Sequence, residues 1–260
     1  AIFNGSGNSI VAWCWKVGTT SGKTTTGETI TPTAYSINAT SGFGMYAWNG
    51  SAGTGAIAHG LSSAPQFFIV KRRDGGQNWY AGGSLLTSGD YNLYLNTTVA
   101  EQNAGDAIWQ GNFPSSTLMY LGSDGEVNGA SKTFIMYSFA AVQGFSKFGT
   151  YVGNGNDDGP VVFTGFRPAL VIIKRSDGSD GWNMWDNKIN PHNEVTKFLS
   201  PDSTEAEQTG SSDHQLDFLS NGFKCRESGS EINTSGGNYV YMAFAEAPFV
   251  NSEGVPCTAR

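Results

Sequence analysis

Residues 234–248 read TSGGNYVYMAFAEAP, and this stretch decides the fold because close variants of it occur twice more in the chain. Residues 130–142 read ASKTFIMYSFAAV and residues 6–18 read SGNSIVAWCWKVG. In each copy a turn of small polar residues precedes a run of apolar and aromatic residues, which is typical of a strand covered on both faces. The stretch therefore predicts the closing strand of a β-rich unit that is present more than once.

The rest of the chain repeats with a period of about 103 residues. APQFFIVKRRDGGQNWY (64–80) matches RPALVIIKRSDGSDGWNMW (167–185), with a proline near the strand start and an Asp-Gly pair in the turn after it. Proline is tolerated where a strand begins, and Asp-Gly suits a tight hairpin turn. Both copies also contain a Thr-x-x-Glu sequence, at 98–101 and at 204–207, which predicts one short helical turn in each unit.

We therefore expect an all-β fold of two tandem antiparallel β-sandwiches of the jelly-roll or lectin-like kind. The first covers residues 42–143, and the second covers residues 144–260 with a C-terminal tail. Residues 19–41 are rich in Thr, Ser and Gly and are predicted to form a linker or a peripheral hairpin. Residues 1–18 are predicted to hold the closing strand of a preceding unit. Because residues 10–15 are apolar on both faces, we expect them to be buried, with pairing across the chains of a homo-oligomer favoured over the same chain or an upstream domain.

Composition narrows the class of function. Gly accounts for 35 of 260 residues and charged residues for only 14%, a profile of turn-rich β proteins with weakly charged surfaces. The net charge of −7 argues against nucleic acid as a partner. Three cysteines, Cys14, Cys225 and Cys257, form no CxxC motif and cannot all pair, which favours assembly in a reducing cytoplasm over a secreted disulfide framework. No apolar run reaches the roughly 18–20 residues of a membrane helix, so no membrane insertion is predicted.

Sequence motifs for catalysis or nucleotide binding are absent, and the three histidines are interpreted as lone surface or turn residues. Carboxylates lie among glycines at 153–160 and 176–181, where hard oxygen ligands suit Ca²⁺. The candidate ligands are Asp157, Asp158, Asp177 and Asp180. Plain hairpin turns are the alternative, because the ligand order of an EF-hand loop is missing. We expect no cofactor and no enzymatic activity, although the paired carboxylates of a glycosidase would leave no local motif.

Seven tryptophans and ten tyrosines in a weakly charged chain fit stacking on sugar rings. Four tryptophans hold fixed positions in the repeat, which favours packing in the core of each sandwich: Trp13, Trp15, Trp79 and Trp182. Three others do not recur and are the candidates for exposed ligand contact: Trp48, Trp109 and Trp185. The basic residues at 71–73 and 174–175 are interpreted as solvated charges that discourage edge-to-edge pairing, with contact to an acidic sugar or a neighbouring subunit as the alternative.

Three stretches resemble an uncharacterised repeat domain found at the C-terminal end of large virion proteins of tailed bacteriophages, especially marine ones. They are GFSKFGTYVGNGNDDGPVVFTGFRPALVIIKR (144–175), DFLSNGFKCR (217–226) and YVYMAFAEAPFVNSEGVPCTAR (239–260). The resemblance covers nearly the whole chain and is strongest from 144 to 260. It implies a virion component assembled in the cytoplasm of the bacterial host, with other copies of itself and other virion proteins as partners, and it supplies no catalytic residues.

Three functions compete on this basis. The leading hypothesis is a non-enzymatic structural module of a tail, fibre or capsid that also contacts a glycan on the host surface. The second is a fragment of a carbohydrate-active depolymerase. The third is a purely architectural protein that interlocks subunits by strand exchange and binds no ligand.

Overall fold

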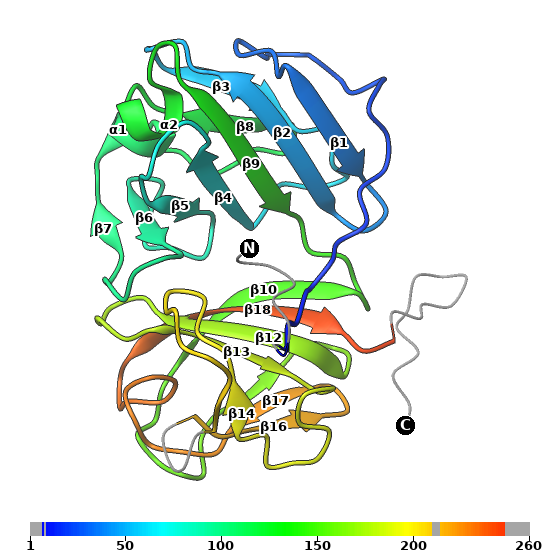
Figure 1. The fold of residues 1–260 in the computed structure, drawn as a ribbon, viewed down its shortest axis with the longest axis vertical. Helices are drawn as coiled ribbons and strands as arrows, with labels where there is room; N and C mark the ends of the chain where they lie inside the picture. Colours follow the sequence, from blue (N-terminus) through cyan, green and yellow to red (C-terminus); the bar gives the residue numbers. More distant parts are fainter. Residues whose placement is uncertain (1–6, 8, 210–213, 248–260) are drawn as a thin grey trace.

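The computed structural model describes residues 7, 9–209 and 214–247, and nearly all of its regular structure is β-strand (Figure 1). The strands of the first half are β1 (Ala34–Asn38), β2 (Phe43–Asn49), β3 (Gly55–Ala58), β4 (Phe67–Arg72), β5 (Trp79–Gly82), β6 (Tyr91–Tyr94), β7 (Gln102–Asn103), β8 (Leu118–Leu121) and β9 (Thr133–Phe139). Those of the second half are β10 (Ser146–Val152), β11 (Val161–Phe163), β12 (Pro168–Arg175), β13 (Trp182–Asp186), β14 (Lys197–Phe198), β15 (Gln208–Thr209), β16 (Leu216–Leu219), β17 (Gly222–Cys225) and β18 (Asn238–Ala245). Two short helices are present, α1 (Asp106–Trp109) and α2 (Gly125–Asn128). In this part of the chain no helix has the length and apolar character needed to cross a membrane.

The first half of the chain builds a seven-stranded sheet in the order β1-β2-β9-β4-β5-β6-β7, together with the two-stranded sheet β3-β8. All of the pairings are antiparallel. Alternate side chains of the larger sheet point toward β3, β8 and the helices, because successive residues of a strand face opposite sides. The resulting core contains Tyr46, Trp48, Ile57, Phe68, Trp109, Met119 and Met136.

The second half builds a four-stranded sheet in the order β10-β18-β12-β13, which is accompanied by the three-stranded sheet β11-β17-β16. The short pair β14-β15 lies beside β13, which it joins through a bridge between Met184 and Leu199. The core of this half contains Val171, Ile173, Trp185, Phe218, Phe223, Tyr239 and Tyr241.

The two larger sheets agree in strand order and in register. Lys71 of β4 lies opposite Trp79 of β5 and Ile135 of β9. Lys174 of β12 lies in the same way opposite Trp182 of β13 and Val240 of β18. This is the register that follows from aligning residues 64–80 with 167–185.

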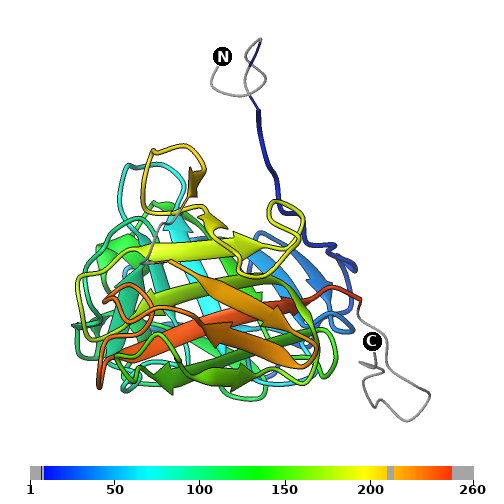
Figure 2. The ribbon, with the colours of Figure 1, turned by 90° about the horizontal axis from the view of Figure 1, so that it is seen from below.

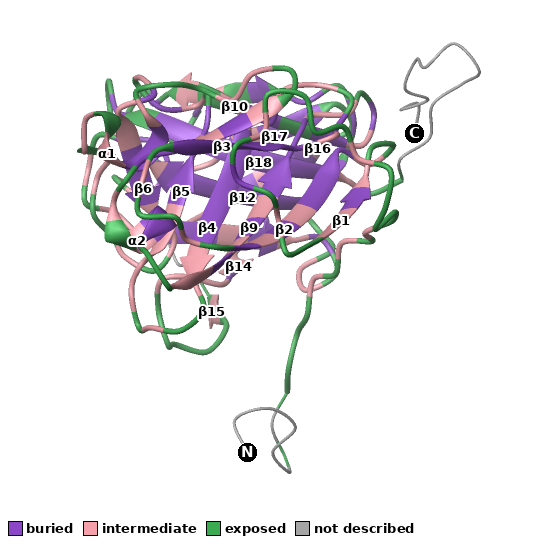
Figure 3. Cartoon of the chain, turned by 90° about the horizontal axis from the view of Figure 1, so that it is seen from above, coloured by how far each residue is buried: buried purple, intermediate pink, exposed green. Residues whose placement is uncertain are grey.

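A third apolar cluster joins the halves, because the larger sheets pack against each other through their remaining faces. It contains Phe43, Phe67, Phe139, Leu170, Trp182, Met242 and Phe244, and we call it the seam. The molecule is thus a stack of sheets with buried strands inside and exposed loops at the rim (Figure 3). The seam explains why the strands of the larger sheets are apolar on both faces, since each face is covered by another sheet.

The two Thr-x-x-Glu sequences do not form helical turns, so the prediction of one helical turn in each unit is wrong. Residues 98–101 and 204–207 have no regular secondary structure, and both helices lie in the first half. The carboxylate of Glu101 accepts a hydrogen bond from the backbone N–H of Thr87 at 3.2 Å. That of Glu207 pairs with the Lys197 ammonium at 2.9 Å. Both capping carboxylates are engaged in contacts distant in sequence, which compete with the local turn.

Residues 19–41 contribute more than a linker. Their last part forms the edge strand β1, which pairs with β2 along its whole length. Ile30 and Ile37 are buried in the core of the first half, and Lys23 forms a buried ion pair with Glu28. The Glu28 carboxylate also accepts a hydrogen bond from the backbone N–H of Ala58 at 3.1 Å. Both charges therefore keep polar partners although they are removed from water.

Candidate functional site

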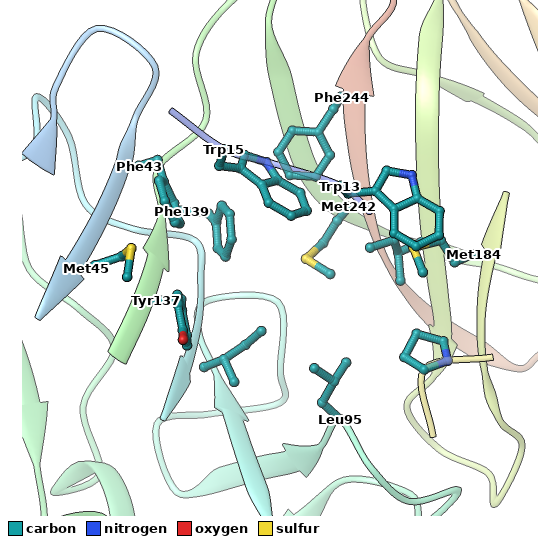
Figure 4. A pocket seen from close by; sticks show the side chains of 13 residues that line it. Trp13, Trp15, Phe43, Met45, Leu95, Tyr137, Phe139, Met184, Met242 and Phe244 are labelled. Atoms are coloured by element: carbon teal, nitrogen blue, oxygen red, sulfur yellow. The ribbon is translucent and has the colours of Figure 1, made fainter. Parts of the chain in front are cut away.

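A pocket of about 440 Å³ opens within the seam, between the two halves (Figure 4). We call it the seam pocket. Its lining side chains come from both larger sheets, from the N-terminal segment and from two turns: Trp13, Trp15, Phe43, Met45, Ile69, Leu95, Tyr137, Phe139, Ile172, Met184, Pro201, Met242 and Phe244. None of these side chains carries a charge, so the pocket suits an alkyl or aromatic group rather than a polar substrate.

Strand alternation places these residues in the pocket. Tyr137 and Phe139 are two positions apart on β9, and Met242 and Phe244 are two positions apart on β18, so both pairs point to the same side of their sheets. Three of the lining residues are methionines, which have unbranched, flexible side chains that adapt to irregular spaces. The pocket wall can therefore adjust to groups of different shape.

The N-terminal segment covers one side of the pocket. Residues 9–18 are extended without belonging to a strand, and this dark blue segment runs from β1 past the seam and projects from the body (Figures 1 and 2). Trp13 Nε1 donates a hydrogen bond to Asp186 Oδ2 of β13 at 2.7 Å. On the other side, Asn38 Nδ2 of β1 donates to the carbonyl of Lys16 at 3.2 Å. The segment is thus attached to both halves.

The recurring tryptophans pack in the seam, so their predicted place in the core of each sandwich is wrong. Trp182 is buried there, and its Nε1 donates to the carbonyl of Tyr94 in the first half at 2.9 Å. Trp13, Trp15 and Trp79 are half-buried and pack against the same cluster. A fixed position in the repeat signals a packing role, but it does not say which of the two faces of a sheet is packed.

Residues 1–248 match a protein family described as Domain of unknown function (DUF7483). The chain belongs to this family. No curated protein and no solved structure matches the chain at a significant level. Because the family description carries no function, a function for this chain must be argued from its own residues.

The three tryptophans predicted to be exposed are buried, so that prediction is wrong. Trp48 is 1% exposed and stacks on Phe134 with ring centroids 5.3 Å apart. Trp109 is also 1% exposed and meets Phe68 edge-on at 4.7 Å. Trp185 is fully buried and donates its Nε1 hydrogen to the carbonyl of His214 at 2.9 Å. Each fills the core of its half and offers no face for a sugar ring. The alternation of Tyr46 with Trp48 on one strand is the sequence signal that indicates this burial.

The four aspartates predicted as Ca²⁺ ligands do not form a site. Asp157 and Asp158 lie in an exposed loop, where Asp158 pairs with Lys224. The hydrogen bond from Lys224 lowers the pKa of the Asp158 carboxyl. Asp177 and Asp180 both pair with the guanidinium of Arg175, at 2.7 and 3.0 Å. Among the residues with a described placement, no group of three or more His, Cys, Asp or Glu side chains could hold a metal ion. Three of the four carboxylates are thus neutralised, by Lys224 of β17 and by Arg175 across the turn after β12.

Lys71 in β4 and Lys174 in β12 close the hairpins that follow these strands, so the interpretation of these two residues as solvated charges is wrong, whereas Arg73 is exposed. Lys71 Nζ donates to the carbonyls of Gly75 at 3.1 Å and Gln77 at 2.6 Å. Lys174 Nζ does the same to Gly178 at 3.1 Å and to Arg175. Lys174 is fully buried, and burial lowers its pKa to about 8. These lysines satisfy turn carbonyls that would otherwise lack a donor.

Two further titratable groups are buried, one in each half. His59, predicted to lie at the surface or in a turn, is fully buried. Its Nδ1 accepts a hydrogen bond from the backbone N–H of Leu61 at 3.0 Å, and its Nε2 lies 3.2 Å from the carbonyl of Ser115. The ring is therefore neutral with the proton on Nε2. Cys225 is also buried, and burial raises the pKa of its thiol to about 12, which makes it unreactive.

Proposed function

We propose that this chain is a non-enzymatic structural module of a tailed-bacteriophage virion. It is assembled in the cytoplasm of the bacterial host, with other copies of itself and other virion proteins as partners. The assignment to a virion rests on the resemblance of residues 144–260 to repeat domains of phage virion proteins. The choice of a structural role over a catalytic one rests on the apolar packing between the two halves.

The proposal includes two tandem β-sandwich repeats of the jelly-roll or lectin-like kind. Its support is the common strand order and register of the larger sheets, β2-β9-β4-β5 and β10-β18-β12-β13. The smaller sheets correspond as well, since β3 pairs with β8 as β11 pairs with β17. The halves differ in β1 and the helices, which only the first half has, and in β16, which only the second half has.

The observation that carries a structural role is the seam. Both larger sheets bury their second face against each other, and polar contacts reinforce the packing. Trp182 donates to the Tyr94 carbonyl, and the backbone N–H of Glu101 donates to the Ser176 carbonyl at 2.7 Å. Apolar burial supplies about 25 cal/mol per Å², so the packed faces hold the two halves together. Two halves joined by both apolar packing and hydrogen bonds are suited to a structural role in a particle.

The test is localisation on purified phage particles. Immunogold labelling and peptide mass spectrometry of virions are expected to find the chain, and its absence from particles would exclude the proposal. Host-surface attachment needs a separate test, because the three tryptophans predicted to contact a glycan are buried. A glycan array provides that test. Release of new reducing ends from host capsule or lipopolysaccharide would favour a depolymerase instead.

A further inference from the structure

The three copies of the closing stretch meet at one point of the structure. Trp15, Phe139 and Phe244 occupy the same position in the three copies. Their rings contact one another pairwise, with centroids 5.8 Å apart for Trp15 and Phe139, 5.4 Å for Trp15 and Phe244, and 6.1 Å for Phe139 and Phe244. Two residues earlier, the equivalent side chains of Trp13, Tyr137 and Met242 all line the seam pocket (Figure 4). The N-terminal copy therefore presents the same face to the seam as the other two copies do.

Two of the three copies are central strands with a neighbour on each side. β9 lies between β2 and β4, and β18 lies between β10 and β12. The N-terminal copy, residues 9–17, forms no ladder with any strand of the described chain. Apart from the Lys16 carbonyl, which accepts a hydrogen bond from Asn38 Nδ2 of β1, its backbone makes no hydrogen bond to another described residue, which is unusual for an apolar segment.

The outer face of the N-terminal copy is bare. Ile10 is 56% exposed, and Ala12 and Cys14 are exposed as well. Their counterparts in the other two copies all face a sandwich core and are buried: Phe134, Met136, Ser138, Tyr239, Tyr241 and Ala243. The residue types on this face are those of a core strand, but no second layer covers them.

We propose that residues 9–17 are the central strand of a third sheet, completed by an incomplete unit of the same repeat pattern. This partner unit has counterparts of β2 and β4 but no closing strand of its own, and it is not one of the two units in residues 34–245. It pairs with both edges of residues 9–17 and lays its smaller sheet over Ile10, Ala12 and Cys14. The partner unit's counterparts of Met45 and Ile69 enter the seam pocket. The pocket is then enclosed by three sheets, namely the two larger sheets of this chain and the new sheet around residues 9–17.

A second copy of this chain does not meet these requirements. Both of its units already hold their closing strands, β9 and β18, between two neighbours. Its open edges, such as that of β10, would pair with one side of residues 9–17 and leave the bare face uncovered. The inference does not depend on the virion assignment, because it rests only on sequence equivalence and ring contacts.

The test supplies such a partner unit from the chain's own sequence. A second copy of residues 144–232, which ends just before the closing turn, is fused directly to residue 4 of the chain. Cys14 reports the outcome through its alkylation rate with iodoacetamide. Cys257 and the cysteine of the added copy are replaced by serine, and the buried Cys225 is the internal reference. We expect alkylation of Cys14 to slow at least about tenfold relative to the unfused chain, because a covered thiol reacts only through opening of the structure.

The matched control is Ala12→Asp in both chains. In the unfused chain Ala12 is exposed, so the substitution is expected to leave Cys14 labelling and stability unchanged. In the fusion it places a carboxylate in the third core and is expected to restore fast labelling. Amide exchange of β9 and β18 shows in each case whether the original halves remain folded.

Two results would overturn the proposal. One is a fusion in which β9 and β18 stay protected while Cys14 reacts as fast as in the unfused chain. The other is a concentration-dependent dimer of the unfused chain in which Cys14 is protected, since a second copy would then be what covers this face.

Discussion

Trp182 and Tyr94 tie the two halves together within the seam, where Trp182 Nε1 donates a hydrogen bond to the Tyr94 carbonyl at 2.9 Å. The Trp182 ring is buried and meets Phe67 of the first half edge-on, with centroids 6.2 Å apart. One side chain of the second half thus provides both a polar and an aromatic contact to the first half. Unfolding of one half must break both contacts, so we expect the halves to unfold together.

Replacing Trp182 by Phe should reduce the free energy of unfolding by about 1–3 kcal/mol, because the Tyr94 carbonyl loses its indole donor and keeps only the longer hydrogen bond from the Thr97 backbone N–H at 3.4 Å. Urea titration followed by circular dichroism measures the loss. Trp79→Phe is the matched control, since Trp79 has the equivalent position but is half-buried, and it should cost less than about 1 kcal/mol. Equal losses for the two variants would contradict the role of the Trp182 hydrogen bond.

Replacing Phe244 by Ala should cost about 3–5 kcal/mol, as large-to-small substitutions of buried Phe do. Phe244 is 8% exposed and contacts the rings of Trp15, Phe139 and Phe148. Phe163, which is 62% exposed, provides the comparison, and Phe163→Ala should change stability by no more than about 0.5 kcal/mol. A loss below about 1 kcal/mol for Phe244→Ala would place its side chain outside the core.

Trp13 and Asp186 should be energetically coupled, because the indole N–H donates to the carboxylate at 2.7 Å. A double-mutant cycle with Trp13→Phe and Asp186→Ala should yield a coupling energy of about 0.5–1.5 kcal/mol. The same cycle between Trp13→Phe and Asp157→Ala should yield none, since Asp157 lies in an exposed loop of the second half. Zero coupling for the first pair would show that residues 9–18 leave the seam in solution.

Stability should fall on acidification because of His59. Burial lowers the pKa of His59 below its ordinary value of 6.5, which outweighs the opposite effect of the Ser115 carbonyl. Below pH 6.5 His59 is therefore protonated in the unfolded chain more readily than in the folded chain. The free energy of unfolding decreases as the pH falls below 6.5. Urea titrations between about pH 7 and pH 5 should show this slope, and His59→Asn should flatten it. An unchanged slope in the variant would assign the effect to other groups.

Stability should also fall under alkaline conditions because of Cys225. Burial raises the pKa of this thiol from 9.0 to about 12, so above pH 9 the unfolded chain loses a proton that the folded chain keeps. The stabilisation is fully present below pH 9 and is lost as the pH rises toward 12. Cys225→Ala should reduce the slope, and an unchanged slope in this variant would assign the effect to other groups. Buried tyrosines such as Tyr241, whose pKa burial raises to about 12, account for the slope that remains.

Much of the strand pattern could be predicted from residues close together in the chain. The Asp-Gly pairs at 74–75 and 177–178 follow β4 and β12, and the register of Lys71 opposite Trp79 recurs as Lys174 opposite Trp182. These features depend on turn chemistry and on alternation within a few residues, which are local properties. The helical turns predicted at 98–101 and 204–207 were wrong because Glu101 and Glu207 engage partners outside their own turns.

The candidate site could not be predicted, because it depends on which surfaces meet. Trp48 and Trp182 are both large aromatic residues on strands, yet one lies in the core of the first half and the other in the seam. The aspartates of residues 153–181 appeared suited to a cation, but Lys224 and Arg175 already neutralise three of them. Partners of this kind come from other strands or across turns, so spacing along the chain does not identify them.

The sequence by itself determined that the chain is almost all β, where most of its strands and tight turns lie, and that one stretch occurs in three versions. Those properties follow from alternation, turn residues and repetition, all of which operate over short distances. Only the tertiary structure decided that the larger sheets pack face to face, that Trp15, Phe139 and Phe244 meet, and that the N-terminal copy belongs to no strand and keeps one bare face. An apolar face is stabilised by burial, but the hydrophobic effect is non-directional. Which surface covers a given face therefore depends on how all the sheets pack together.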